Sequence, residues 1–328
     1  MKKVFLLCAG LVLVAVLGVS LLLNLFFVGR YASHGASSRE FTETHVSGDN
    51  DSHGKVAIID LMGVISYGIE GDLNPSMVED VIAKLRQARN DDSIKAILLR
   101  IDSPGGEVTA SDVIYHEIVK TNKVKPVVSY VDSVGASGAY YSAVGTRYIM
   151  ANELSITASI GVILQTMNFE KLGDKVGVQS VTFKSGKMKD LLNPFRPVSE
   201  EERAYVQGLI DETYSKFVGI VARERKLDET KLRNTIADGR ILSGKTAVKE
   251  GLIDATGYIE DALAKVRQFA GLPADAEVIR LEAPYSLSRF FRILGKSPVS
   301  QVQVNIGPEG IRLESGKLYY ISQHLFAH

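Results

Sequence analysis

Gly135-Ala136-Ser137-Gly138 places a serine among residues with almost no side chain, at a point where a helix is expected to begin. A serine hydroxyl becomes a nucleophile only when a nearby base takes its proton. Histidine is the usual base, yet His116 is the only histidine between residues 55 and 315. The pattern predicts acyl-transfer chemistry with a serine–lysine pair, a variant of the serine–histidine arrangement. The alternative is that Ser137 only caps a tightly packed helix.

The candidate bases lie in one short segment, Lys184-Ser185-Gly186-Lys187-Met188-Lys189-Asp190. A lysine with its ordinary pKa of about 10.4 is protonated at neutral pH, so a base lysine must be desolvated and kept away from carboxylates. Hydroxyls of Thr157 or Ser159 could hold such a lysine. The alternative for each lysine is a solvated surface charge.

A glycine-rich turn, Asp102-Ser103-Pro104-Gly105-Gly106-Glu107, follows a continuous apolar run. Two glycines after a proline permit a tight turn whose backbone N–H groups point outward. Such a turn can hold an anion or the oxyanion of a reaction intermediate. An ordinary strand-to-helix turn would have the same composition.

Four motifs in this order resemble the signal peptide peptidase A serine peptidases. They are S-P-G-G, G-A-S-G-A-Y-Y, T-A-S-I-G-V and K-S-G-K-M-K-D. The resemblance covers about residues 55 to 270 together with the apolar N-terminus, and it implies an α/β protein with the Clp/crotonase-like fold. Ala139 departs from the second glycine that close relatives often carry, by a single methyl group.

Site residues follow from the resemblance position by position. It implies that Ser137 is the nucleophile, that Lys189 is the general base and that Ser159 orients this lysine. It further implies that the N–H groups of Gly106 and Gly138 form the oxyanion hole. On position alone Lys187 remains a rival base.

The resemblance also implies the partners. Substrates would be hydrophobic peptides, namely remnant signal peptides, and the active assembly would be a ring-shaped homo-oligomer whose serine and lysine come from neighbouring protomers. No cofactor and no metal are expected. The related Clp proteolytic subunit takes its base from a histidine after the serine, but here none follows Ser137 until His324. His116 precedes the serine and is interpreted as structural.

Composition limits the remaining classes. The 328 residues carry a formal net charge of zero, which argues against a nucleic-acid partner. Cys8 is the only cysteine, so no disulfide framework exists. The uncharged run Val4–Val28 can cross a membrane as an uncleaved anchor, with the catalytic domain on the extracytoplasmic side. A cleaved signal peptide and a buried core helix are the alternatives.

The anchor (1–28) is expected to precede a flexible linker (29–54), a peptidase domain (55–300) and a C-terminal tail (301–328). Alternating strands and helices predict parallel βαβ units. Strands are expected at 56–60, 94–101, 127–131, 148–151, 161–167, 179–183, 277–282 and 318–321. Helices are expected at 75–88 with Asn74 as N-cap, and at 109–119, 136–144, 200–225, 229–236, 244–249 and 258–269.

Two functions of other classes fit parts of the pattern. A crotonase-type acyl-CoA hydratase or isomerase would share the glycine-rich anion turn, although the apolar anchor argues against a cytosolic thioester substrate. A catalytically silent membrane scaffold would keep the fold without the chemistry.

Overall fold

The computed structural model describes residues 10, 13–14, 16–26, 41–50, 54–67, 76–283 and 319–321. The chain divides into two compact units, Met1–Glu40 and Phe41–His328. Most of the described residues inside the predicted span Val4–Val28 are helical, while the rest of that span and most of the predicted tail lie outside the described residues. Within the described ranges, no helix has both the length and the apolar character needed to cross a membrane.

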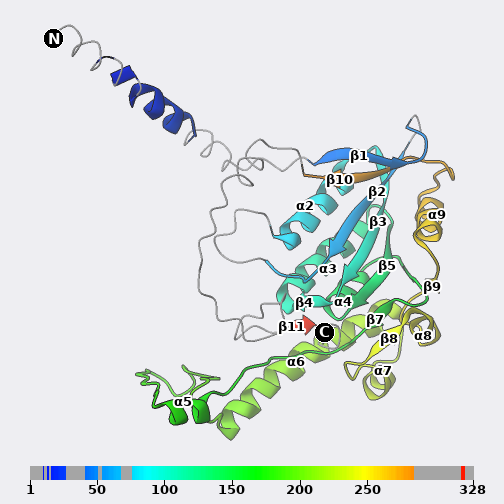
Figure 1. Cartoon of the computed structure of the whole chain (residues 1–328). Coiled ribbons are helices and arrows are strands. Elements are labelled where there is room, and N and C mark those ends of the chain that lie inside the picture. The colour runs from blue at the N-terminus through cyan, green and yellow to red at the C-terminus, as the bar shows by residue number, and fades with distance from the viewer. Residues whose placement is uncertain are drawn as a thin grey trace. The chain divides into compact units, whose positions relative to one another are not determined.

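The second unit is built on a nine-stranded sheet with the main order β1-β10-β2-β3-β5-β6-β9 (Figure 1). Strand β7 continues the sheet beside β5, and β8 pairs with β7. Pairing is parallel except for β1 on β10 and β8 on β7. The strands are β1 Thr42–Ser47, β2 Lys55–Met62, β3 Ile94–Ser103, β5 Val127–Ala136, β6 Tyr148–Ala151, β7 Ile156–Ala158, β8 Ile241–Ser243, β9 Ala255–Thr256 and β10 Val278–Glu282.

The central strands are apolar on both faces, as buried parallel strands are. In β2, Ala57, Ile59 and Leu61 join one core, while Val56 and Ile58 join the core on the opposite face. Helices α2 Met77–Asn90, α3 Val108–Asn122, α4 Gly138–Ala143, α6 Glu200–Arg225, α7 Glu229–Thr235 and α8 Gly244–Lys249 contribute to the first core. Helix α9 Ile259–Ala270 covers the second core.

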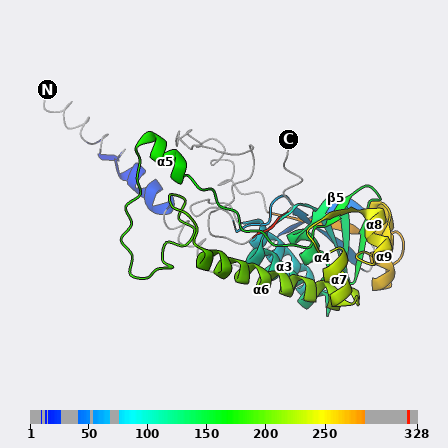
Figure 2. The same cartoon turned by 90° about the horizontal axis from the view of Figure 1, so that it is seen from below.

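Helix α6 joins this core to an exposed segment. Its C-terminal half packs inward through Phe217, Val218 and Val221, whereas Glu202 is the one buried residue of its first half. Before it runs the segment 162–199, here called the arm, which includes α5 Glu170–Val176. Figures 1 and 2 show α5 and its flanking chain at the end of α6 that lies away from the sheet.

Two predicted strands do not form. Residues 161–167 and 179–183 are not strand in the structure, and most of their side chains are exposed. Their β-branched and aromatic composition favours a strand only where a neighbouring strand and a core are present. Among the described residues no strand pairs along either segment, so the prediction was wrong for both.

Two boundaries also differ from expectation. Residues 42–47 of the predicted linker form β1, because their backbone pairs with β10 at the sheet edge although the side chains are exposed. The first long helix is capped by Ser76 rather than by Asn74, which lies outside the described residues. Ser76 and Glu79 form a reciprocal capping box that satisfies two backbone donors, which explains this start.

Candidate active site

Ser137 occupies a sharp turn between β5 and α4. Its backbone has φ 54° and ψ −117°, a conformation rarely adopted by residues other than glycine, and the residue is buried. The Ser137 N–H donates to the Ala158 carbonyl at 2.7 Å, and its carbonyl accepts from Tyr141 N–H at 2.8 Å. The side chain makes no capping hydrogen bond, so the simple cap expected as the alternative is not formed.

Helix α4 is held rigidly behind the serine. Tyr140 donates its hydroxyl to the Leu252 carbonyl at 2.8 Å, and Tyr141 donates to Asp112 Oδ1 at 2.5 Å. The Tyr141 ring stacks edge-on against Phe217 of α6, with centroids 5.0 Å apart. Burial raises the pKa of Tyr140, so this hydroxyl stays a neutral donor. The two tyrosines of α4 thus fix the helix that follows the serine turn to the protein core.

The glycine turn lies beside the serine turn. Ser103 at the end of β3 pairs with Gly135 of β5, so the two loops leave neighbouring parallel strands at the same level. Gly105 has φ +97°, which requires glycine. A Cβ at Gly106 would lie 2.0 Å from the Ile65 carbonyl oxygen, so no other residue fits there.

The N–H of Gly106 faces the edge of β4 (Gly105–Glu107) that lies away from Ile65. Ile65 donates to the Gly105 carbonyl at 2.9 Å and accepts from Glu107 N–H at 2.8 Å. Because alternate residues of a strand face opposite edges, the Gly106 N–H points to the other side. On that side lies β11 (Tyr319–Ile321), antiparallel to β4, with Tyr320 opposite Gly106. The tail strand was expected from its composition, but its partner was not.

Ser159 emerges beside Ser137. Strand β7 pairs with β5 in a register that places Ala158 opposite Ala136, so the next residues, Ser159 and Ser137, leave the sheet together. Ala158 and Ser159 both have positive φ, 66° and 52°. The Ser159 hydroxyl donates to the Gly239 carbonyl at 3.1 Å, not to a lysine.

The other candidate hydroxyl, Thr157, donates to the Gly135 carbonyl at 2.8 Å and so supports the serine turn instead.

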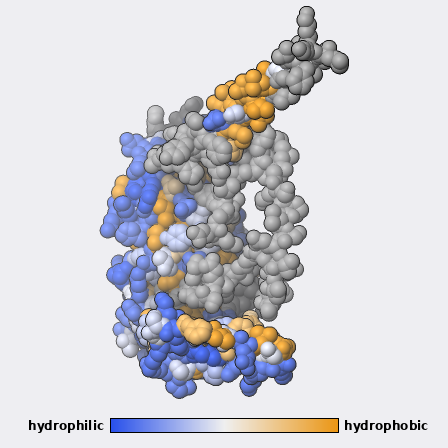
Figure 3. All heavy atoms as spheres, turned by 90° about the vertical axis from the view of Figure 1, so that its left-hand side faces the viewer, coloured by the Kyte–Doolittle hydropathy of each residue, from blue (hydrophilic) through white to orange (hydrophobic). Residues whose placement is uncertain are grey.

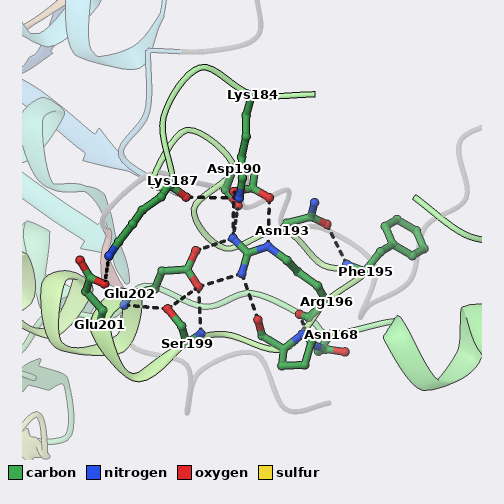
Figure 4. Close-up of polar contacts among 11 residues, drawn as sticks. Asn168, Lys184, Lys187, Asp190, Asn193, Phe195, Arg196, Ser199, Glu201 and Glu202 are labelled. Atoms are coloured by element: carbon green, nitrogen blue, oxygen red, sulfur yellow. Dashed lines mark hydrogen bonds and ion pairs between the residues drawn. The ribbon is translucent and has the colours of Figure 1, made fainter. Parts of the chain in front are cut away.

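The lysines lie elsewhere, in the arm. Lys189 is exposed, its N–H donates to the Gly186 carbonyl at 3.0 Å, and no hydrogen bond joins it to Ser137 or Ser159. Lys184 pairs with Asp190 at 2.5 Å, and Lys187 pairs with Glu201 (Figure 4). The structure therefore brings Ser137, Ser159 and the glycine turn together and leaves Lys189 apart from them.

His116 is exposed on α3 and makes no hydrogen bond with the serine turn, so it has no part in this site. Across the residues that the structure describes, no group of three or more His, Cys, Asp or Glu side chains is placed to hold a metal ion.

Comparisons with known proteins agree with this geometry. The model of peptidase family S49 matches residues 120–273, and that of Clp protease matches residues 58–165. A putative protease of Methanocaldococcus jannaschii is 38% identical over 83% of this chain and 84% of its own. A putative signal peptide peptidase SppA of Enterococcus faecium is 35% identical over 74% and 71% of the two chains.

A plant protein, the chloroplastic serine protease SPPA of Arabidopsis thaliana, is 35% identical over 70% of this chain and 34% of its own. The mostly parallel sheet is consistent with a Clp-protease-like fold, as the Clp protease match implies. With relatives this similar over most of both chains, the chain belongs to peptidase family S49 and is a serine peptidase.

Proposed function

We propose that the chain is a membrane-anchored serine endopeptidase in which Ser137 is the nucleophile and Lys189 the general base. The observation that carries the proposal is the strained, buried backbone of Ser137 at the end of β5. Such strain costs about 1–3 kcal/mol and persists only where the surroundings enforce it, commonly at active sites. The neighbouring Gly106 N–H supplies the donor that the reaction needs.

The reaction follows from these groups. Lys189 takes the hydroxyl proton while Ser137 Oγ bonds to the substrate carbonyl carbon, and the N–H groups of Gly106 and Gly138 donate to the resulting oxyanion. Protonated Lys189 then gives its proton to the leaving amine as the C–N bond breaks. Neutral Lys189 next takes a proton from a water as the water oxygen bonds to the ester carbon. Protonated Lys189 then returns this proton to Ser137 Oγ as the ester C–O bond breaks and the acid product leaves. Ser159 would hold the lysine in place through its free lone pairs.

The substrate is proposed to bind as an extended peptide along β4. This edge is paired with β11 as an antiparallel strand, so a peptide backbone fits it, and a substrate would take the place of β11. That mode suits a polypeptide and does not suit an acyl-CoA thioester. The favoured substrates are remnant signal peptides, since the apolar run Val4–Val28 would anchor the enzyme in the same membrane that releases them. The catalytic domain would then lie on the extracytoplasmic side.

A ring-shaped homo-oligomer is proposed to deliver Lys189 from a neighbouring protomer. The arm exposes large apolar side chains, and Figure 3 shows a group of hydrophobic atoms at the bottom of that view. The exposed side chains of the arm include Met167, Leu172, Val176, Val178, Val181, Phe183 and Phe195. Exposed apolar surface of this extent is typical of a protein interface. Docking of the arm on a neighbouring protomer would bury this apolar surface and bring Lys189 to that protomer's Ser137.

The test is turnover of hydrophobic peptides by the full chain in detergent. Ser137→Ala should lower kcat at least about 10³-fold because the covalent route is lost. Thermal unfolding should be unchanged, since the serine hydroxyl caps nothing. Ser129→Ala, on the same strand, is the matched control because its hydroxyl has no partner among the described residues. More than a tenth of the activity remaining in Ser137→Ala would contradict the assignment.

A further inference from the structure

One polar cluster stands out in the exposed arm, centred on Arg196 (Figure 4). Arg196 donates through Nε and Nη2 to both carboxylate oxygens of Asp190, at 2.9 and 3.0 Å, and through Nη1 to Glu202 Oε2 at 2.8 Å. Nη2 also donates to the Asp190 carbonyl at 3.0 Å. The Asp190 and Glu202 side chains are 11% and 4% exposed, so the cluster is enclosed although the surrounding arm is not.

The cluster fixes the lysine segment to helix α6. Asp190 directly follows Lys189, while Glu202 belongs to the first turn of α6 and is held by the Ser199 cap. A planar guanidinium that binds two carboxylates in this way sets both distance and orientation. Arg196 therefore determines where the segment stands relative to the helix that carries the arm.

Each carboxylate near the lysine segment is paired with a cation. Asp190 is occupied by Arg196 and Lys184, Glu202 by Arg196, and Glu201 by Lys187. Hydrogen bonds from Arg196 and then Lys184 hold the pKa of Asp190 well below its usual range, so it remains ionised. Lys189 is the one lysine of its segment without an ion pair in the described structure.

We propose that Arg196 is a positioning residue for the general base, because it occupies Asp190 and keeps this carboxylate from pairing with Lys189. The inference rests on the proposed role of Lys189. Without Arg196, Asp190 would keep only Lys184, and its second oxygen would be free for the adjacent lysine. The charged form of Lys189 would then be favoured, and the enzyme would need a higher pH to work.

The test is the pH dependence of kcat/KM for the full chain. Arg196→Gln should move the acid limb upward by at least about one pH unit, with about tenfold less activity at neutral pH and recovery in alkali. Arg196→Lys keeps a charge near Asp190, so its acid limb should stay close to the wild-type position. In Arg196→Gln/Asp190→Asn no carboxylate remains to pair, so the limb should return to the wild-type position. Arg203→Gln, on an exposed pair of the same helix, is the control.

The outcomes separate the alternatives. A loss that is equal at every pH and that Asp190→Asn does not restore would show a merely structural role and overturn the inference, as would an unchanged profile. If Arg196→Gln does not fold, Asp190→Asn alone serves as the test. An upward shift of its acid limb would contradict the inference that Asp190 can pair with Lys189. Lys189→Arg is measured in parallel, so that the proposed base role of Lys189 and the proposed positioning role of Arg196 are tested separately. If Lys189→Arg is active, the proposed base is wrong; if it is inactive and Arg196→Gln shows no shift, only the inference fails.

Discussion

The serine region and the arm hold their functional groups by different means. Ser137, Ser159 and Gly106 stand at the ends of neighbouring strands, so backbone register inside the core sets their positions. Lys189 stands on an exposed segment whose shape depends on ion pairs between side chains. The proposed nucleophile is thus positioned within one folded chain, whereas the proposed base lies on an exposed segment that must still approach a serine.

The sharpest test of this contrast compares two neighbouring lysines. Lys189→Arg should lower kcat at least about 10²-fold, because a guanidinium cannot act as a base at accessible pH. Lys187→Arg should stay within about threefold of wild type, because arginine can keep the pair with Glu201. Peptide turnover by both variants measures this. The reverse result would assign the base to Lys187.

The separation of serine and base predicts complementation between inactive chains. Ser137→Ala and Lys189→Ala should each be inactive alone. Randomly mixed in a closed ring, about a quarter of the interfaces would join an intact serine to an intact lysine, and activity should recover to that fraction. Turnover is measured on oligomers shown to contain both chains. No recovery in such oligomers would mean that each chain builds its own pair.

Acid should loosen the arm before the serine region. Hydrogen bonding to Arg196, and then to the Ser199 N–H, lowers the pKa of Glu202 from 4.5 to about 2. A carboxylate with a lowered pKa stabilises the fold above about pH 4.5 and loses that effect as the pH falls through about 2.

Pepsin should therefore cut the arm at least about threefold faster, relative to the sheet, at pH 2 than at pH 4. Glu202→Gln lacks the titrating group and should show a smaller change with pH. Equal sensitivity of both proteins would mean that the cluster does not hold the arm.

The smallest effect concerns the helix behind the serine. Tyr140→Phe should lower the free energy of unfolding by about 1–2 kcal/mol, because the buried Leu252 carbonyl loses its donor. Tyr205→Phe, on the exposed part of α6, should change it by less than about 0.5 kcal/mol. Chemical denaturation measures both. A larger loss at Tyr205 would mean that the exposed half of α6 contributes more to stability than the core does.

The sequence predicted correctly the strands that are buried in the core. The mostly apolar runs at 94–101 and 148–151 became β3 and β6, and the helix expected at 200–225 became α6. It was misleading at 161–167 and 179–183, where strand-forming residues pair with no strand in the part of the chain that the structure describes. Local propensity cannot show whether a partner strand is present.

The sequence predicted the location of the candidate site but not its detailed geometry. Small residues around Ser137 and the glycine turn marked the place of the chemistry, but φ 54° at a serine has no sequence signature. The pairing of β11 with β4 depends on chain segments more than two hundred residues apart. Arg196 carried no local signal either, because its role exists only once Asp190 and Glu202 face it across a folded turn.

Helix α6 has a geometric consequence for the lysine. Its 26 residues span about 39 Å at 1.5 Å per residue, and only its C-terminal half is fixed to the core. The number of residues in the free half therefore sets both the reach of Lys189 and the direction in which it points. An insertion of two residues would turn the arm by about 200°, whereas seven would return it to nearly the same direction about 10 Å farther out. Evolution of this arm is thus expected to proceed in whole helical turns.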